Sequence, residues 1–88
     1  MSAQFAWTVE TPEGTAASGT CELLVVPTAS GELGVLADHA ALVACVVPGD
    51  LRVSVGGSET SVRVGAGVVD VRDNRVRLLV SSAAAPPA

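Results

Sequence analysis

Turn-forming residues divide this chain of 88 residues into short apolar segments, and their spacing restricts the fold more than any other feature. In segment 51–55, Leu and Val alternate with Arg and Ser, which is the two-residue period of a half-buried strand. Gly56-Gly57 and Asp73-Asn74 each supply residues that tolerate the backbone conformation of a two-residue hairpin turn. No helical periodicity of useful length occurs. The sequence therefore predicts an all-β fold without substantial helix, an antiparallel β-sandwich or flattened barrel of about eight to ten strands, with a partly open barrel as the alternative.

The composition predicts one small domain with an aliphatic core. A second core would leave each half of the chain with too little apolar surface to bury. Almost half of the residues are apolar, but they include one Phe, one Trp and no Tyr, so Val, Leu and Ala must fill the interior. We expect the domain to occupy residues 1–82, and residues 83–88, which are small and include Pro, to form a flexible tail.

The charge balance excludes several classes of partner. The net charge is −4, and all five cationic side chains are arginines. A negative surface almost without aromatic side chains cannot neutralise phosphates or stack bases, so we expect no nucleic-acid binding. An anionic membrane surface is disfavoured for the same reason, and no apolar run reaches the roughly eighteen residues of a membrane span. We expect a soluble, cytoplasmic domain without direct membrane insertion, associated with a membrane only through another protein.

The two cysteines, Cys21 and Cys45, each lie inside an apolar, strand-like run. In a cytoplasmic protein such residues are more often buried free thiols than a disulfide, although the disulfide stays possible. Two cysteines and one histidine are too few for a closed structural zinc site, so we expect no bound metal.

The sequence offers little for catalysis. It contains one histidine, no lysine and scattered acids, whereas catalysis needs a nucleophile with a base, paired carboxylates or a metal. Asp38 and His39 are adjacent, but neighbours in an extended segment point to opposite faces. Biotinyl and lipoyl carrier domains need a lysine as their attachment point, so that class is excluded. We therefore expect no catalytic residue and no cofactor.

Four local features predict the path of the backbone. Ser18-Gly19 predicts a kink or bulge, and Pro27 predicts the end or edge of a strand, because proline cannot donate to a ladder. Gly31 and Gly34 are expected to bracket a turn, both with positive φ. The triplet 65–67, which contains two glycines, predicts a bend or a close approach of two backbones.

One stretch resembles a known family. Gly31-Glu32-Leu33-Gly34-Val35, followed by Asp38-His39-Ala40 and Leu42, resembles the epsilon subunit of F-type ATP synthases, called delta in mitochondria. In that family, Gly-Glu-Leu-Gly-(Ile or Val) runs into Gly-His-Ala-Pro-Leu. Further segments resemble the family's strands and turns, namely 9–14, 48–53, 65–71 and 74–79. The resemblance covers nearly the whole chain, from about residue 4 to residue 82, and implies the family's N-terminal domain, a ten-stranded β-sandwich.

The resemblance implies a non-catalytic rotor subunit of the central stalk, which couples ion-driven rotation of the c-ring to the gamma subunit. It would be peripheral, held at the cytoplasmic face of the inner membrane through the complex. Many family members continue into a C-terminal helical hairpin that can restrain ATP hydrolysis and in some binds ATP. This chain ends before that hairpin, so we expect neither inhibition by it nor ATP binding.

The family's contact positions fall, by direct match, on two groups of residues. The resemblance implies c-ring contacts through Gly31, Glu32 and Leu33, with Glu32 pairing with a basic residue of a ring loop. It implies gamma contacts through Thr11, His39 and Ala40.

This chain departs from the family pattern beside the histidine, where Ala37-Asp38 replaces Pro-Gly and Ala41 replaces Pro. These changes predict a less rigid and more acidic loop. Apart from the resemblance, the residues themselves leave two other functions open. The first is a stand-alone β-sandwich adaptor that binds a protein strand or loop through an exposed edge. The second is an enzyme whose cleft converges on His39 with Asp38 or Glu32.

Overall fold

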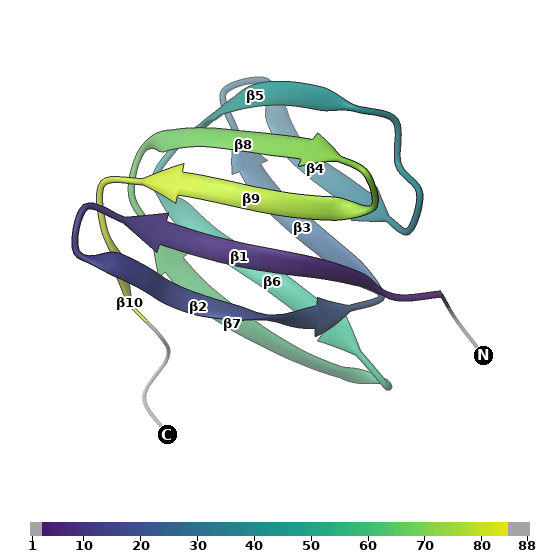
Figure 1. Ribbon diagram of the computed structural model, residues 1–88. Coiled ribbons are helices and arrows are strands. Elements are labelled where there is room, and N and C mark those ends of the chain that lie inside the picture. Colours follow the sequence, from purple (N-terminus) through teal and green to yellow (C-terminus); the bar gives the residue numbers. More distant parts are fainter. Residues whose placement is uncertain (1–2, 85–88) are drawn as a thin grey trace.

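The computed structural model describes residues 3–84, which contain ten β-strands and no helix (Figure 1). In chain order the strands are β1 (Phe5–Thr11), β2 (Gly14–Cys21), β3 (Leu23–Thr28), β4 (Gly31–Leu36), β5 (Leu42–Val46), β6 (Gly49–Val55), β7 (Ser58–Val64), β8 (Gly67–Arg72), β9 (Arg75–Val80) and β10 (Ala83–Ala84). The all-β class and the number of strands predicted from the sequence are confirmed.

The strands form two layers that are joined through β3. Hydrogen bonding follows the order β10-β7-β6-β3-β5-β8-β9-β1-β2, and β4 pairs with β3. Figure 1 shows β5, β8, β9, β1 and β2 in a front sheet, with β4, β3, β6 and β7 in a back sheet. β3 pairs with β6 over residues 23–25 and reaches β5 at Thr28, so one strand belongs to both sheets. The pairing of β1 with β9 is parallel, which the expectation of a purely antiparallel fold did not include.

The core lies between the inner faces of the two sheets and consists of small aliphatic side chains. Val62 and Val64 point inward and are buried, as their alternation predicts. No polar or charged residue is buried within residues 3–84. The largest fully buried side chains are Leu24, Leu51, Leu78, Val9, Val26, Val35, Val69, Val71, Val76 and Cys21.

The two hairpin turns predicted from local chemistry are confirmed. Gly56 and Gly57 connect β6 to β7 with φ values of 59° and 80°. Asp73 and Asn74 connect β8 to β9 with φ values of 51° and 57°. Asp and Asn are among the few non-glycine residues that adopt this left-handed conformation at low cost.

The kink predicted at Ser18-Gly19 is wrong, because β2 is continuous there. Gly19 pairs with Trp7 of β1, and a Cβ at Gly19 would lie 3.4 Å from Trp7 Nε1. Gly19 therefore lies against the indole ring in a strand that is not bent there. The irregularity in this pairing lies between Val9 and Glu10, nearer the turn.

β3 extends one residue beyond Pro27, to Thr28, so the strand does not end at Pro27; the other predicted outcome, an edge position, fits the register, in which neither β6 nor β5 pairs with residues 26–27. Pro27 faces Glu32 of β4, and its carbonyl accepts a hydrogen bond of 3.0 Å from the N–H of Val47. The N–H and C=O of one residue point to the same side of a strand. The N–H that Pro27 lacks would therefore point to the side on which β3 stops pairing with β6 and begins to pair with β5. The segment from Gly31 is a strand and not a turn; Gly31 has a φ of 113°, but Gly34 has no positive φ.

The tail predicted from residue 83 begins with a strand. Ala83 and Ala84 form β10, which pairs with β7, and Ala83 packs against the core. The N–H of Gly65 donates to the carbonyl of Ser82 at 2.9 Å, which fixes the segment before β10. Residues 85–88 lie outside the described residues.

The two cysteines have different environments. Cys21 is fully buried, Cys45 is exposed, and both are free thiols. The prediction of free thiols is confirmed, but that of a buried Cys45 is wrong. The inward positions of β5 are those of Leu42, Ala44 and Val46, so Cys45 lies on the outer face. Burial, with a smaller contribution from Glu22, raises the pKa of the Cys21 thiol to about 11.

Replacement of Gly67 by Ala should destabilise the domain strongly. A Cβ at Gly67 would lie 1.9 Å from the backbone oxygen of Leu79, which confirms the close approach predicted at 65–67. We expect Gly67→Ala to lower the free energy of unfolding by at least about 2 kcal/mol in urea titrations. The matched control is Gly34→Ala, because its nearest heavy atom would be Leu23 Cδ1 at 3.9 Å and the change should stay within about 1 kcal/mol. Equal stability of the two variants would contradict the packing described.

The alkaline stability of the domain should depend on Cys21. The pKa of its thiol is raised in the folded state from 9.0 to about 11, so this contribution to stability is complete below pH 9 and is lost as the pH rises through 11. The chain has no Lys and no Tyr, so in a Cys45→Ser background no other side chain titrates in this range. We expect the free energy of unfolding to fall between pH 9 and 11 in Cys45→Ser and to stay flat in Cys21→Ala/Cys45→Ser. A fall of the same size in both variants would refute this assignment.

Candidate functional site

The six residues predicted to contact partners lie in three places on the sandwich. Gly31, Glu32 and Leu33 begin β4 in the back sheet. Thr11 ends β1 in the front sheet, and His39 and Ala40 lie in the loop between β4 and β5.

Glu32 lies on the outer face of the back sheet and already has a partner within the chain. Its Oε1 accepts a hydrogen bond of 3.0 Å from Nη2 of Arg52 on β6, so the ion pair reaches across β3. The side chains of Glu32 and Arg52 are 67% and 39% exposed. A surface ion pair of this kind contributes about 0–1 kcal/mol, so the carboxylate can exchange Arg52 for another cation at low cost.

Glu32 and Leu33 face opposite sides of β4. Leu33 packs against the core and is half-buried, whereas Glu32 points to solvent. Gly31 follows the two-residue turn 29–30, and its carbonyl accepts a hydrogen bond from the hydroxyl of Thr28. Of the three residues predicted to contact the c-ring, Glu32 is therefore the one whose side chain is free to reach a partner.

Asn74 holds the loop that carries His39. Its Oδ1 accepts a hydrogen bond of 2.7 Å from the N–H of Asp38, and its Nδ2 donates to the carbonyl of Gln4 at 3.3 Å. Asp38 has a φ of 60°, and the N–H of His39 donates to the carbonyl of Leu36 at 3.3 Å. One side chain thus joins the hairpin β8–β9, the loop and the segment before β1. The sequence marked Asn74 as a turn residue, but nothing in it revealed this second role.

The hydrogen bonds at Asp38 and His39 affect the loop that the Ala37-Asp38 substitution was predicted to make less rigid. In the family pattern a glycine precedes the histidine, and here Asp38 adopts the left-handed conformation in its place. The hydrogen bond from its N–H to Asn74 compensates part of the cost. The loop is therefore tied to the hairpin at Asp38, which the substitutions alone did not predict.

Thr11 lies at the opposite end of the front sheet from His39. Its hydroxyl donates to the carbonyl of Gly14 at 3.3 Å and accepts from the N–H of Glu13 at 3.2 Å, closing the β1–β2 turn. At the other end of β1, Gln4 precedes the strand, and its carbonyl accepts the hydrogen bond from Asn74. At about 3.3 Å per residue, the length of β1 separates the two predicted gamma contacts by roughly 20 Å.

An apolar strip lies on the outer face of the front sheet between these two ends. The strip consists of Val43, Cys45, Val68 and Leu79, which are all exposed; Val43 is 69% and Leu79 42% exposed. In the register of the sheet, Val68 pairs with Cys45 on one side and with Leu79 on the other. The apolar runs 42–47 and 78–80 contained this signal, because both parities of each strand are apolar there. These runs were interpreted only as strands, not as a surface.

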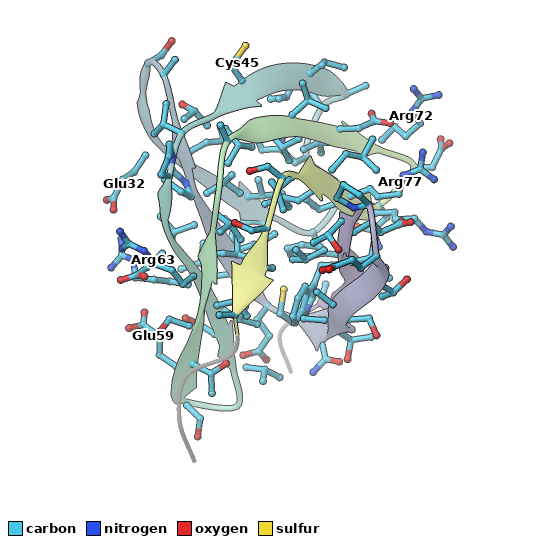
Figure 2. All side chains as sticks on the ribbon, turned by 90° about the vertical axis from the view of Figure 1, so that its left-hand side faces the viewer. Glu32, Cys45, Glu59, Arg63, Arg72 and Arg77 are labelled. Carbon is cyan, nitrogen blue, oxygen red and sulfur yellow. The ribbon has the colours of Figure 1, made fainter. Side chains whose placement is uncertain are left out.

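Figure 2 separates the two outer faces of the sandwich. Glu32, Arg63 and Glu59 lie along one side, Arg72 and Arg77 lie on the other, and Cys45 lies at the top. Within residues 3–84 no three His, Cys, Asp or Glu side chains gather as a metal site requires. The described part of the chain also holds no helix that could cross a membrane.

Comparison with known proteins identifies the family. Residues 4–86 match the family model of the ATP synthase delta/epsilon chain β-sandwich domain. The chain therefore belongs to this family. It is 41% identical over 80 residues to the ATP synthase epsilon chain of Alkalihalophilus pseudofirmus, covering 91% of this chain and 60% of that protein. It is 43% identical over 76 residues to the ATP synthase epsilon chain of Persephonella marina, covering 85% of this chain and 56% of that protein.

Solved structures agree with this fold. The chain is similar to one in the Euglena gracilis mitochondrial ATP synthase OSCP/F1/c-ring structure, with a TM-score of 0.86, 26% identity and coverage of 97% of this chain and 55% of that one. A chain in the central stalk/c-ring structure of the Tetrahymena thermophila mitochondrial ATP synthase shares the fold, with a TM-score of 0.74 and 20% identity. The match covers 93% of this chain and 66% of that one. The chain thus spans about three fifths of the length of the curated relatives named above.

Removal of the Asn74 side chain should loosen the His39 loop without breaking the hairpin. Asn74→Gly keeps the left-handed backbone of the turn but loses both side-chain hydrogen bonds. We expect amide exchange at Asp38 to rise about two- to tenfold, the equivalent of one hydrogen bond, as measured by NMR. Asn74→Asp, which keeps an acceptor for the Asp38 N–H, is the matched control and should retain most of the protection. Unchanged exchange in Asn74→Gly would show that the side chain does not hold the loop.

Proposed function

We propose that this chain is a non-catalytic subunit of the central stalk of an F-type ATP synthase, and that it couples rotation of the c-ring to the gamma subunit. Membership of the delta/epsilon family supports the proposal. So does the similar Euglena gracilis structure, whose description includes F1 and the c-ring. In this proposal the subunit is peripheral and is held at the cytoplasmic face of the inner membrane by the complex.

The observation that carries the proposal is the placement of two exposed surfaces on opposite sheets of one body. Glu32 lies on the outer face of the back sheet, and the apolar strip lies on the outer face of the front sheet. A part that transmits torque between two partners needs two contact surfaces and a stiff connection between them. β3 supplies such a connection, because it pairs with strands of both sheets.

We assign the contact with the c-ring to the hairpin β3–β4. Glu32 is exposed, and its pair with Arg52 is of the weak surface type. A basic residue on a ring loop would take over the carboxylate of Glu32, while Gly31 and Leu33 set the path of the strand.

We assign the contact with gamma to the outer face of the front sheet. Thr11 and His39 lie at opposite ends of this face, so a partner that touches both must cross the apolar strip between them. Exposed apolar side chains that adjoin one another are typical of protein contact surfaces. Ala40 would extend this contact at the loop end, where Asn74 fixes the neighbouring backbone.

Reversal of the charge at position 32 should weaken retention of the c-ring. In Glu32→Arg the new cation would face both Arg52 and the basic ring residue, and we expect a loss of about 1–3 kcal/mol in ring binding. The measurement is the amount of c-ring that co-purifies with the tagged chain from cells. Glu59→Arg is the matched control, because Glu59 lies exposed on the same sheet face and should tolerate the change.

Equal c-ring recovery from wild type and Glu32→Arg, with both variants folded, would refute the Glu32 assignment. The same purification separates the proposal from the stand-alone adaptor. A central-stalk subunit should recover a gamma homologue in about equal amount, whereas an adaptor should recover none. Absence of gamma from the wild-type preparation would therefore refute the proposed function as a whole.

A further inference from the structure

Three of the five cations of the chain lie together on the outer face of β8 and β9. Arg72 and Arg75 face each other directly across the ladder, and Arg77 follows on the same face of β9. Figure 2 shows Arg72 and Arg77 on the side of the molecule opposite to Glu32. In a chain of net charge −4, this is a local concentration of positive charge.

The three arginines differ in their partners. Arg72 Nε donates to Oδ1 of Asp70 at 3.2 Å, and this bond raises the pKa of Arg72. Arg77 Nε lies 3.9 Å from Oε2 of Glu10. For Arg75, residues 3–84 supply no ion pair. Like charges directly opposite one another in a sheet destabilise it, so Arg75 beside Arg72 costs the isolated domain stability.

The surroundings of Arg75 indicate which anion fits. A hollow of about 440 Å³ is lined by Asp70, Arg72, Asp73, Arg75 and Arg77. Three cations and two carboxylates give this lining a net charge of +1, which suits one carboxylate better than a multiply charged phosphate. The hollow also adjoins the apolar strip, since Asp70 pairs with Val43 in the sheet.

We propose that the partner surface on the front sheet is apolar over the strip and presents a carboxylate to Arg75. The inference rests on the proposed function, in which that partner is the gamma subunit. Arg75 then acts as a specificity residue. It costs stability in the free chain, and its charge is paired when the partner docks. The two carboxylates in the hollow reject a second acidic group, so the match is to a single acid beside apolar side chains.

The experiment compares Arg75→Gln with Arg63→Gln in binding to the gamma subunit from the same genome. Arg63 is the control, because it is exposed on the opposite sheet face and pairs with Asp50. We expect Arg75→Gln to weaken binding about tenfold at low salt, with the difference shrinking as salt is added, and Arg63→Gln to bind like wild type. In the free chain, Arg75→Gln should keep or raise the melting temperature, because the repulsion from Arg72 is removed.

A Leu79→Ser variant separates failure of this inference from failure of the proposed function. If Leu79→Ser weakens gamma binding and Arg75→Gln does not, the docking face stands and the carboxylate on Arg75 is refuted. If neither variant weakens binding, gamma does not dock on this face. That result would refute both the assignment of gamma to the front sheet and the carboxylate on Arg75. A third outcome is saturable binding of inorganic phosphate that Arg75→Gln abolishes. It would show a site for a small anion and would also overturn the inference.

Discussion

The structure depends on the burial of short aliphatic side chains between two sheets. With one Phe, one Trp and no Tyr, the chain fills its core with Val and Leu at alternate positions of most strands. Backbones also approach closely within one sheet, where Gly67 of β8 lies beside the backbone of Leu79 in the adjacent strand β9. Small domains have little stability to spare, and docking to a partner stabilises them.

The alternation of side chains along each strand also determines which residues lie on the outer faces of the two sheets. Every second residue of a strand faces solvent, and in this chain the two outer faces have different chemistry. The back sheet exposes charged side chains such as Glu32, Arg52 and Glu59, whereas the front sheet combines the apolar strip with the arginines of β8 and β9. A domain of this size can therefore present two chemically distinct surfaces on opposite sides.

Features set by neighbouring residues could be predicted from the sequence, whereas those set by distant strands could not. The hairpins at Gly56-Gly57 and Asp73-Asn74 follow from local turn chemistry. β3 extends past Pro27 because the missing N–H falls where β3 changes partners, which no local pattern reveals. For the same reason the sequence did not reveal the parallel pairing of β1 with β9, or the hydrogen bond that the N–H of Asp38 donates to Asn74, a residue 36 positions away. The family motif located Glu32, but its pair with Arg52 needed the register of three strands.

The central claim is that one stiff sandwich contacts two partners through opposite sheets. The most direct test places a photo-crosslinking amino acid at position 32 or at position 43 of the chain within the assembled complex. The account predicts crosslinks from position 32 to the c-ring subunit and from position 43 to gamma, identified by mass spectrometry. Crosslinks from both positions to the same subunit, or an exchange of the two partners, would contradict it.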